Sequence, residues 1–211
     1  MSSAENLLPL IVEPEQLAAH LGDDRLLIID VPLRAESHLE GHVPGAVFLD
    51  FRRLMRGSGD VPNEVPGPEA LSQLFSSLGL TRDTHVVAYD DEGGGWAGRL
   101  LWTLELIGHN RYSYLNGGIH AWRQAGQAVS REVNEPTPSN YEAKILRPEI
   151  AIDRLELQER LGSKDFAVWD ARSPEEYRGE KGNNRHLGRL PGAGNLEWTP
   201  AMDPERGLRI R

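Results

Sequence analysis

Three consecutive acidic residues, Asp90, Asp91 and Glu92, stand directly before a glycine-rich stretch, residues 93–98 (GGGWAG). Clustered carboxylates could coordinate a hard cation, and a G-x-G-x-x-G pattern between a strand and a helix could hold a dinucleotide. Neither is expected here, because three neighbouring carboxylates do not converge easily on one ion and their charge opposes a pyrophosphate. The pattern instead predicts a solvated acidic loop, then a turn that lets the next helix pack on a sheet.

A histidine pair could form part of a metal site. His38 and His42 are four residues apart with Glu40 between them, and on a continuous helix this spacing suits zinc. Gly41 is expected to end the helix, which moves His42 off that face, and no third ligand is evident in the sequence. We therefore expect His42 to be a structural residue that bonds nearby backbone.

Composition limits the chemistry further. The 211-residue chain contains no cysteine, so no disulfide, thiolate–metal site or cysteine nucleophile can form in it. The sequence has neither a G-x-S-x-G elbow nor a P-loop. The formal net charge of -9 disfavours nucleic acid and anionic membranes as partners. No cofactor and no metal are expected.

The overall composition is that of a folded, globular chain, with 39% hydrophobic and 26% charged residues. Residues 1–15 lack the basic region of a signal peptide. No run approaches the ~20 apolar residues that a membrane span needs. We expect a cytoplasmic protein without a membrane partner.

Strand and helix patterns alternate along the chain. Short apolar runs predict buried strands at residues 26–30, 85–89 and 112–115. Helically spaced apolar residues predict helices at residues 68–80, 96–107 and 119–124. This alternation predicts an α/β fold with a mainly parallel sheet and helices on both faces.

The chain contains an internal repeat, because the segment at 26–50 is echoed by the segment at 166–198. The matching positions are, in order, Asp30 with Asp170, Glu36 with Glu176, and the Pro-Gly-Ala turn at 44–46 with that at 191–193. Each copy predicts a strand, a short acidic helix, a Pro-Gly turn and a second strand. Several matches in order indicate a duplication.

The two copies differ in how far they continue. The first runs on through two more predicted strands, whereas the second stops soon after its Pro-Gly turn. The sequence thus predicts an N-terminal domain over 1–128, a linker over 129–150, and an incomplete C-terminal domain over 151–211. Because half a parallel sheet leaves unpaired N–H and C=O groups, we expect residues 151–211 to be poorly stable or to dock on the first domain or another chain.

Taken together, these motifs resemble the rhodanese family, specifically two-domain bacterial thiosulfate sulfurtransferases. The stretches that carry the resemblance are GHVPGA at 41–46, YDDEGGGWAGR at 89–99, LNGGIHAW at 115–122, WDARSPEEY at 169–177 and EW at 197–198. They are spread over nearly the whole chain and are specific in combination. The resemblance implies an α/β fold, with one rhodanese-like domain whose central parallel sheet is flanked by helices and the first half of a second rhodanese-like domain.

The resemblance also implies a chemistry, the transfer of sulfane sulfur from thiosulfate to cyanide or a thiol acceptor through a cysteine persulfide. In such proteins the C-terminal domain carries the cysteine and the N-terminal domain is silent. Here Asp90 occupies the silent-domain counterpart position, and the cysteine loop of the second copy would lie beyond Arg211. The resemblance therefore implies a sulfurtransferase whose chain, as given, is inactive on its own.

Two residues of the second copy are candidates for the substrate pocket, Arg172 and Trp198. Arg172 and Asp170 are two apart at a strand end, so they could instead form an ion pair that fastens the strand end to a loop; Trp198 could equally pack in the core. Arg189 stands where the first copy has His42. An alternative function remains, that of a non-catalytic rhodanese-domain module for binding or regulation.

Overall fold

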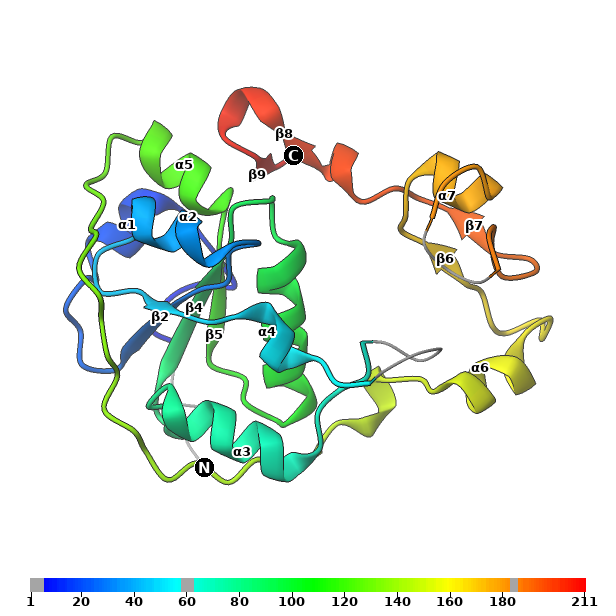
Figure 1. Ribbon diagram of the computed structural model, residues 1–211, viewed down its shortest axis with the longest axis horizontal. Coiled ribbons are helices and arrows are strands. Elements are labelled where there is room, and N and C mark those ends of the chain that lie inside the picture. Colours follow the sequence, from blue (N-terminus) through cyan, green and yellow to red (C-terminus); the bar gives the residue numbers. More distant parts are fainter. Residues whose placement is uncertain (1–5, 58–62, 183–185) are drawn as a thin grey trace. The chain divides into compact units, whose positions relative to one another are not determined.

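The computed structural model describes residues 6–57, 63–182 and 186–211 (Figure 1). The chain divides into two compact units. Unit 1 contains the described residues up to Arg147 together with Asp203–Arg211, and unit 2 is Pro148–Met202. In the described part of the chain, no helix has the length and apolar character of a membrane span.

Unit 1 is built on a parallel sheet with the strand order β1-β5-β4-β2-β3. The strands are β1 (Ile11–Val12), β2 (Leu26–Asp30), β3 (Val47–Phe48), β4 (His85–Tyr89) and β5 (Tyr112–Leu115). The three strands predicted from apolar runs are confirmed with the same bounds.

Helices precede or follow these strands along the chain. They are α1 (Pro14–Ala18), α2 (Ala35–Glu40), the 3-10 turn η1 (Phe51–Leu54), α3 (Pro68–Ser77), α4 (Gly95–Leu106) and α5 (Gly118–Gln124). The helices predicted at 68–80, 96–107 and 119–124 are confirmed, with ends shifted by a few residues. Pro68 begins α3 because a proline lacks only an N–H that has no partner in the first turn.

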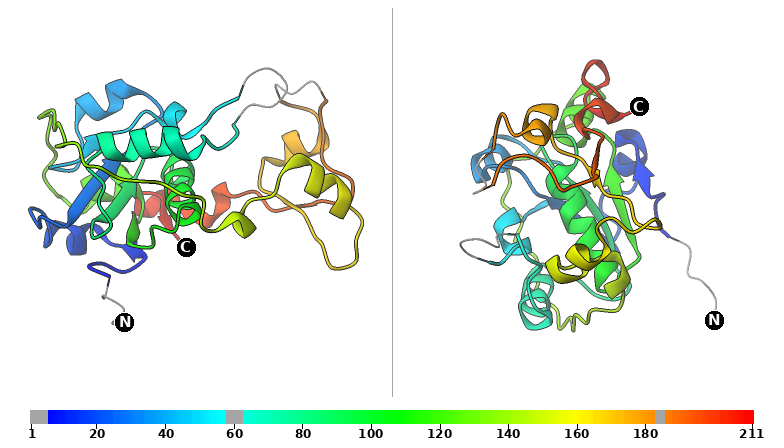
Figure 2. Two further views of the ribbon diagram at one scale, coloured as in Figure 1. Left: turned by 90° about the horizontal axis from the view of Figure 1, so that it is seen from below. Right: turned by 90° about the vertical axis from the view of Figure 1, so that its right-hand side faces the viewer.

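The sheet is covered on both faces, as the apolar runs predict (Figures 1 and 2). Along β4, Val86 and Ala88 pack with residues of α3 and α4, whereas Val87 and Tyr89 pack with residues of α1 and α5. All five residues of this strand are buried. The predicted fold class, a central parallel sheet flanked by helices, is confirmed.

Unit 2 repeats the first part of this pattern on a smaller scale. It contains η2 (Pro148–Ile150), α6 (Arg154–Arg160), β6 (Trp169–Asp170), α7 (Pro174–Arg178), β7 (Gly194–Asn195) and η3 (Thr199–Ala201). β6 pairs with β7 in parallel, with Asp170 opposite Asn195, as β2 pairs with β3 with Asp30 opposite Phe48. The predicted order of strand, short helix and strand is therefore present in both copies.

The chain returns to unit 1 through a short hairpin made of β8 (Met202–Asp203), η4 (Pro204–Arg206) and β9 (Arg209–Ile210). The predicted linker is also attached to unit 1 over much of its length, since Ala143 is 3% exposed and Ser139 N–H donates to the Ser76 carbonyl. The two compact units have boundaries at 147 and 203, which differ from the boundaries of the two sequence repeats. The predicted domain limits at 128 and 150 therefore stay a prediction.

Candidate functional site

The Asp90 side chain, directly after β4, is fully buried and lies in a cradle of backbone N–H groups. Its Oδ1 accepts hydrogen bonds from the N–H groups of Glu92 (3.0 Å) and Gly94 (2.8 Å). Its Oδ2 accepts from those of Trp96 and Ala97, both at 3.0 Å. These four donors offset the cost of burying a carboxylate.

Two features of the chain build this cradle. The first N–H groups of α4 have no partner within the helix, and the helix dipole adds positive character there. Gly93 and Gly94 have φ values of 94° and 107°, which turn the loop back over the helix start. A Cβ at Gly94 would lie 3.0 Å from the Tyr114 hydroxyl oxygen, so the close approach also requires glycine.

The prediction of a solvated acidic loop is wrong for Asp90, because helix N–H groups replace water around its carboxylate. The neighbouring acids bond elsewhere: Asp91 Oδ1 accepts from Leu33 N–H at 3.0 Å, and Glu92 Oε2 accepts from the Trp96 indole at 2.9 Å. The three carboxylates do not converge, and among the described residues no group of three metal-ligating side chains was found.

Burial, and then the charge of Asp90, raise the pKa of the Tyr114 hydroxyl. Tyr114 therefore stays neutral beside the cradle. The N–H donors of the cradle suit it to bind an anion, and the anion that they bind is the Asp90 carboxylate of the same chain. No second anion can use the same N–H groups while Asp90 occupies them.

His42 is a structural residue, as predicted. α2 ends before Gly41, whose φ is 151°. The His42 Nδ1 lies 2.8 Å from the His38 carbonyl oxygen and its Nε2 lies 3.0 Å from that of Glu132. His38 in turn pairs with Asp30, with 2.7 Å between Nδ1 and Oδ2.

A cavity of about 530 Å³ lies beside β6 in unit 2. Its lining consists of residues around this strand and of a loop that follows α7: Val168, Trp169, Asp170, Ala171, Arg172, His186, Leu187, Gly188, Arg189, Leu190 and Ala193. Arg172, a pocket candidate from the sequence, therefore lines this cavity.

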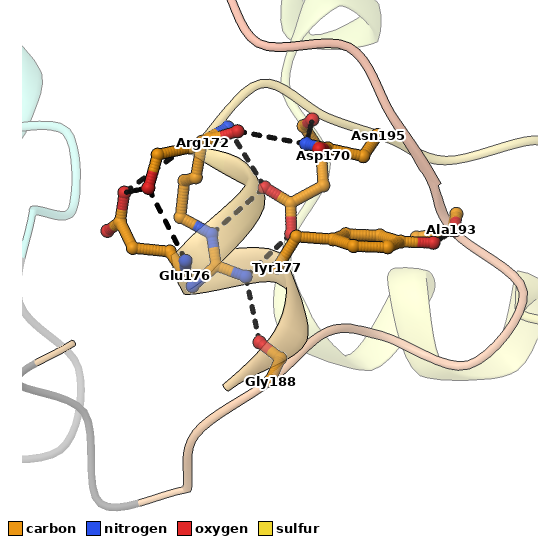
Figure 3. A network of polar contacts seen from close by, with 8 residues as sticks. Asp170, Arg172, Glu176, Tyr177, Gly188, Ala193 and Asn195 are labelled. Carbon is orange, nitrogen blue, oxygen red and sulfur yellow. Dashed lines mark hydrogen bonds and ion pairs between the residues drawn. The ribbon is translucent and has the colours of Figure 1, made fainter. Parts of the chain in front are cut away.

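The Arg172 guanidinium makes a two-point contact with Asp170 (Figure 3). Nε donates to Oδ1 at 2.9 Å and Nη2 to Oδ2 at 2.6 Å, and Nη2 also donates to the Gly188 carbonyl at 2.8 Å. The hydrogen bonds from Arg172 lower the pKa of Asp170. The ion pair considered from the spacing is thus present, and it ties the end of β6 to the loop at Gly188.

Other polar contacts order the same region (Figure 3). The Asn195 side-chain amide donates to the carbonyls of Asp170 and Arg172, both at 2.9 Å, and the Tyr177 hydroxyl donates to that of Ala193 at 2.6 Å. The Arg189 guanidinium lies over the Tyr177 ring, 4.5 Å from its centroid. These side-chain contacts add to the backbone hydrogen bonds of the short β6–β7 pair, in which the N–H groups of Gly194 and Leu196 donate to the carbonyls of Val168 and Asp170.

Trp198, the second candidate, is not among the described residues that line this cavity. Its backbone N–H donates to the Ala171 carbonyl at 3.1 Å, and its side chain is half-exposed. Its role at the pocket stays a prediction. The loop residues Gly188 and Arg189 were missed as pocket residues because nothing in their local pattern indicates that the loop folds back on β6.

A family model described as "Rhodanese-like domain" matches residues 13–125, which contain the strands β2 to β5 of unit 1. The chain belongs to the rhodanese family. It is 47% identical to the thiosulfate sulfurtransferase of Pseudomonas aeruginosa over 204 residues, covering 97% of this chain and 74% of that protein. It is 48% identical to the thiosulfate sulfurtransferase of Azotobacter vinelandii, with the same coverage.

Rhodanese-family structures agree with this assignment. SseA of Escherichia coli, a 3-mercaptopyruvate sulfotransferase, superimposes with a TM-score of 0.85 at 26% identity, covering 96% of this chain and 79% of SseA. The similarity therefore extends through both units and confirms the predicted family.

Proposed function

We propose that this chain is a thiosulfate-type sulfurtransferase by descent and that the 211-residue polypeptide does not transfer sulfur on its own. Relatives named thiosulfate sulfurtransferase, 47% and 48% identical, support the first part. The observation that carries the second part is the filled cradle of unit 1. Its four N–H donors are aimed at a carboxylate, and the chain has no cysteine.

The chemistry explains why a carboxylate cannot substitute. A thiolate attacks the outer sulfur of thiosulfate, the S–S bond breaks, and sulfite leaves with the bonding electron pair. The persulfide then gives its terminal sulfur to cyanide, forming thiocyanate and regenerating the thiolate. Both protein-bound states are sulfur anions, which converging N–H groups at a helix start stabilise. Asp90 supplies a carboxylate anion to the same donors but has no sulfur atom, so it cannot form a persulfide.

In unit 2 we assign Arg172 to the wall of an anion pocket for the sulfur donor. The cavity beside β6 supports this, because its described lining carries Arg189 and Arg172 against one carboxylate, that of Asp170, which is paired with Arg172. An anionic donor such as thiosulfate suits that balance of charge. Trp198 is assigned to the border of the same pocket on the family resemblance.

The assignment is tested by assaying the purified chain for thiocyanate formation from thiosulfate and cyanide. We expect no rate above the uncatalysed reaction. Formation of thiocyanate in proportion to the protein concentration would show that a residue other than cysteine carries sulfur, and would overturn the proposal.

A gain-of-function variant tests the cradle itself. Asp90→Cys places a thiol among the same donors, so we expect its pKa to fall below the ordinary value of about 8.5. Asp91→Cys is the matched control, because Asp91 accepts a single N–H. The pH dependence of the ultraviolet absorbance of the thiolate measures both, and it does not require a reagent to reach the buried position 90. Equal thiol pKa values in the two variants would contradict an anion-stabilising cradle.

A further inference from the structure

The hairpin at residues 203–211 holds a conformation that its own sequence does not favour. Gly207 and Leu208 have φ values of 66° and 60°. Leu208 and Asn63 are the non-glycine residues with positive φ in the described chain. The left-handed region is unfavourable for a leucine, because its Cβ crowds the neighbouring backbone oxygen. Contacts from outside the hairpin must therefore stabilise the turn.

Arg209 supplies the main contact. Its Nε donates to Glu13 Oε2 at 2.9 Å, and its Nη1 donates to Gln124 Oε1 at 3.0 Å and to the Arg206 carbonyl at 2.9 Å. The Arg209 side chain is only 12% exposed. A guanidinium that is this covered and bonded in three directions fixes the position of its backbone.

Asn116, at the carboxyl end of β5, closes the network. Its amide nitrogen donates to Glu13 Oε1 at 2.6 Å, and its carbonyl oxygen accepts from Ile210 N–H at 2.8 Å. Glu13 is thus shared between Asn116 and Arg209. Segments far apart in the sequence, the start of α1, the end of β5 and the hairpin, meet at one carboxylate.

Two glycines permit the approach. A Cβ at Gly117 would lie 2.3 Å from the Gly207 carbonyl oxygen, and a Cβ at Gly207 would lie 3.0 Å from backbone atoms of Ala121. A side chain at Gly117 would force the backbone to shift, and one at Gly207 would need the Ala121 backbone to give by a few tenths of an ångström. The hairpin backbone therefore lies directly on the turn that begins α5 (Figure 1).

The surface that the hairpin covers is the carboxyl edge of the sheet, where open α/β folds place their ligand crevice. Gly118, next to the contact, packs against the Asp90 carbonyl, since a Cβ there would lie 2.2 Å from that oxygen. The edge is thus occupied twice by the chain itself, once by the Asp90 carboxylate and once by the 203–211 hairpin.

We infer that the silent unit acts as an anchor for the polypeptide, with the edge formed by Glu13, Asn116, Gly117 and Gln124 as a binding surface for the 203–211 hairpin. The chain leaves unit 1 at Arg147, where the N–H groups of Leu146 and Arg147 both donate to the Leu106 carbonyl at 3.0 Å. It is anchored again at Arg209. The chain on each side of unit 2 is therefore held by hydrogen bonds within unit 1. This role goes beyond sulfur transfer, because it requires neither a sulfur donor nor a sulfur acceptor.

Hydrogen exchange of the full chain tests the anchor, with the Ile210 amide as reporter because it donates to Asn116. We expect Arg209→Ala and Asn116→Ala each to raise its exchange rate by about tenfold or more, as loss of a charge-assisted or buried hydrogen bond does. Arg206→Ala is the matched control, an exposed arginine in the same hairpin, and should change the rate less than about twofold. Amides of Val86 to Ala88 in β4 report on the remaining fold.

Arg209→Lys gives a graded variant, because it keeps the charge and one donor to Glu13. We expect protection between that of wild type and that of Arg209→Ala, with β4 protection retained. Slow exchange of Ile210 in all variants, or exchange in wild type as fast as in an unstructured peptide, would overturn the inference. If β4 amides lose protection together with Ile210 in Arg209→Lys, the contact is a general stability element and the anchor is rejected.

Discussion

Asp30 and Asp170 hold the same position in the two copies, and their surroundings shift their pKa values in opposite directions. Burial raises the pKa of Asp30, although His38 lies within hydrogen-bonding distance. The hydrogen bonds from Arg172 lower the pKa of Asp170, which is closer to solvent. The two carboxylates hold equivalent positions, but burial dominates the pKa shift of Asp30, whereas the hydrogen bonds from Arg172 dominate that of Asp170.

His85, in β4, offers a titration test at the same scale. Its Nε2 lies 2.7 Å from the Ser113 hydroxyl, which donates to the Pro9 carbonyl at 2.6 Å. The hydroxyl hydrogen is therefore directed to Pro9, so the imidazole must carry its proton on Nε2. Its Nδ1 is buried and has no hydrogen-bond partner among the described residues. Burial first, and then the charges of His109 and Arg111, lower the pKa of His85 to about 4.

The sign of the pH effect follows from this pKa. Between about pH 6.5 and pH 4 the unfolded chain binds a proton at His85 that the folded chain does not bind. The free energy of unfolding should therefore fall as the pH falls through this window, by at most about 3 kcal/mol from this group. His85→Gln keeps a donor for Ser113 and does not titrate. Urea unfolding at several pH values should show a smaller slope for the variant, and equal slopes would contradict the assignment.

At the scale of elements, a glycine just before α4 and a glycine within it have different roles. Gly94 precedes the helix with φ 107°, and an added Cβ would meet Tyr114 at 3.0 Å. Gly98 lies inside the helix, is exposed, and an added Cβ would meet nothing within 4 Å. Gly94→Ala should destabilise unit 1 by about 1–3 kcal/mol, whereas Gly98→Ala should stabilise it by up to about 1 kcal/mol. Urea midpoints measure both, and a Gly94→Ala midpoint equal to or above that of Gly98→Ala would refute the proposed strain.

The elements that could be predicted from sequence are those with a local pattern. The apolar runs at 26–30, 85–89 and 112–115 identified the central strands because a buried parallel strand needs apolar residues on both faces. The burial of Asp90 could not be predicted in the same way, because it depends on φ values at two following glycines. The contact between Glu13 and Arg209 joins positions far apart in the chain and has no local signature.

For the whole molecule, the two units differ in how much apolar surface they bury. Unit 1 encloses an apolar cluster on each face of its sheet. In unit 2 the buried apolar residues, among those described, are Ala193 and Met202, while Trp169 is 69% exposed and Leu196 is 67% exposed. Burial of apolar surface is the main favourable term in folding. Unit 2 should therefore open at far lower free energy than unit 1.

Limited proteolysis measures that difference directly. Trypsin should cut first within unit 2, at exposed sites such as Arg160 and Lys164, at least about tenfold faster than within unit 1. The surviving fragment should extend to about Arg147, beyond the predicted domain end at 128, because Ser139 and Ala143 pack on unit 1. Mass spectrometry of the digest identifies the C-terminal end of the surviving fragment.

The urea dependence of cleavage gives a second measure of the same difference. Low urea should accelerate the cuts in unit 2 only slightly, since its cleavage sites are already open, whereas it should accelerate the cuts in unit 1 steeply. Equal resistance across the chain would contradict this prediction, because unit 2 would then have a core as stable as that of unit 1, formed either by itself or with a second chain. Dilution of the protein before digestion separates these two cases, since a core shared with a second chain would lose its resistance on dilution.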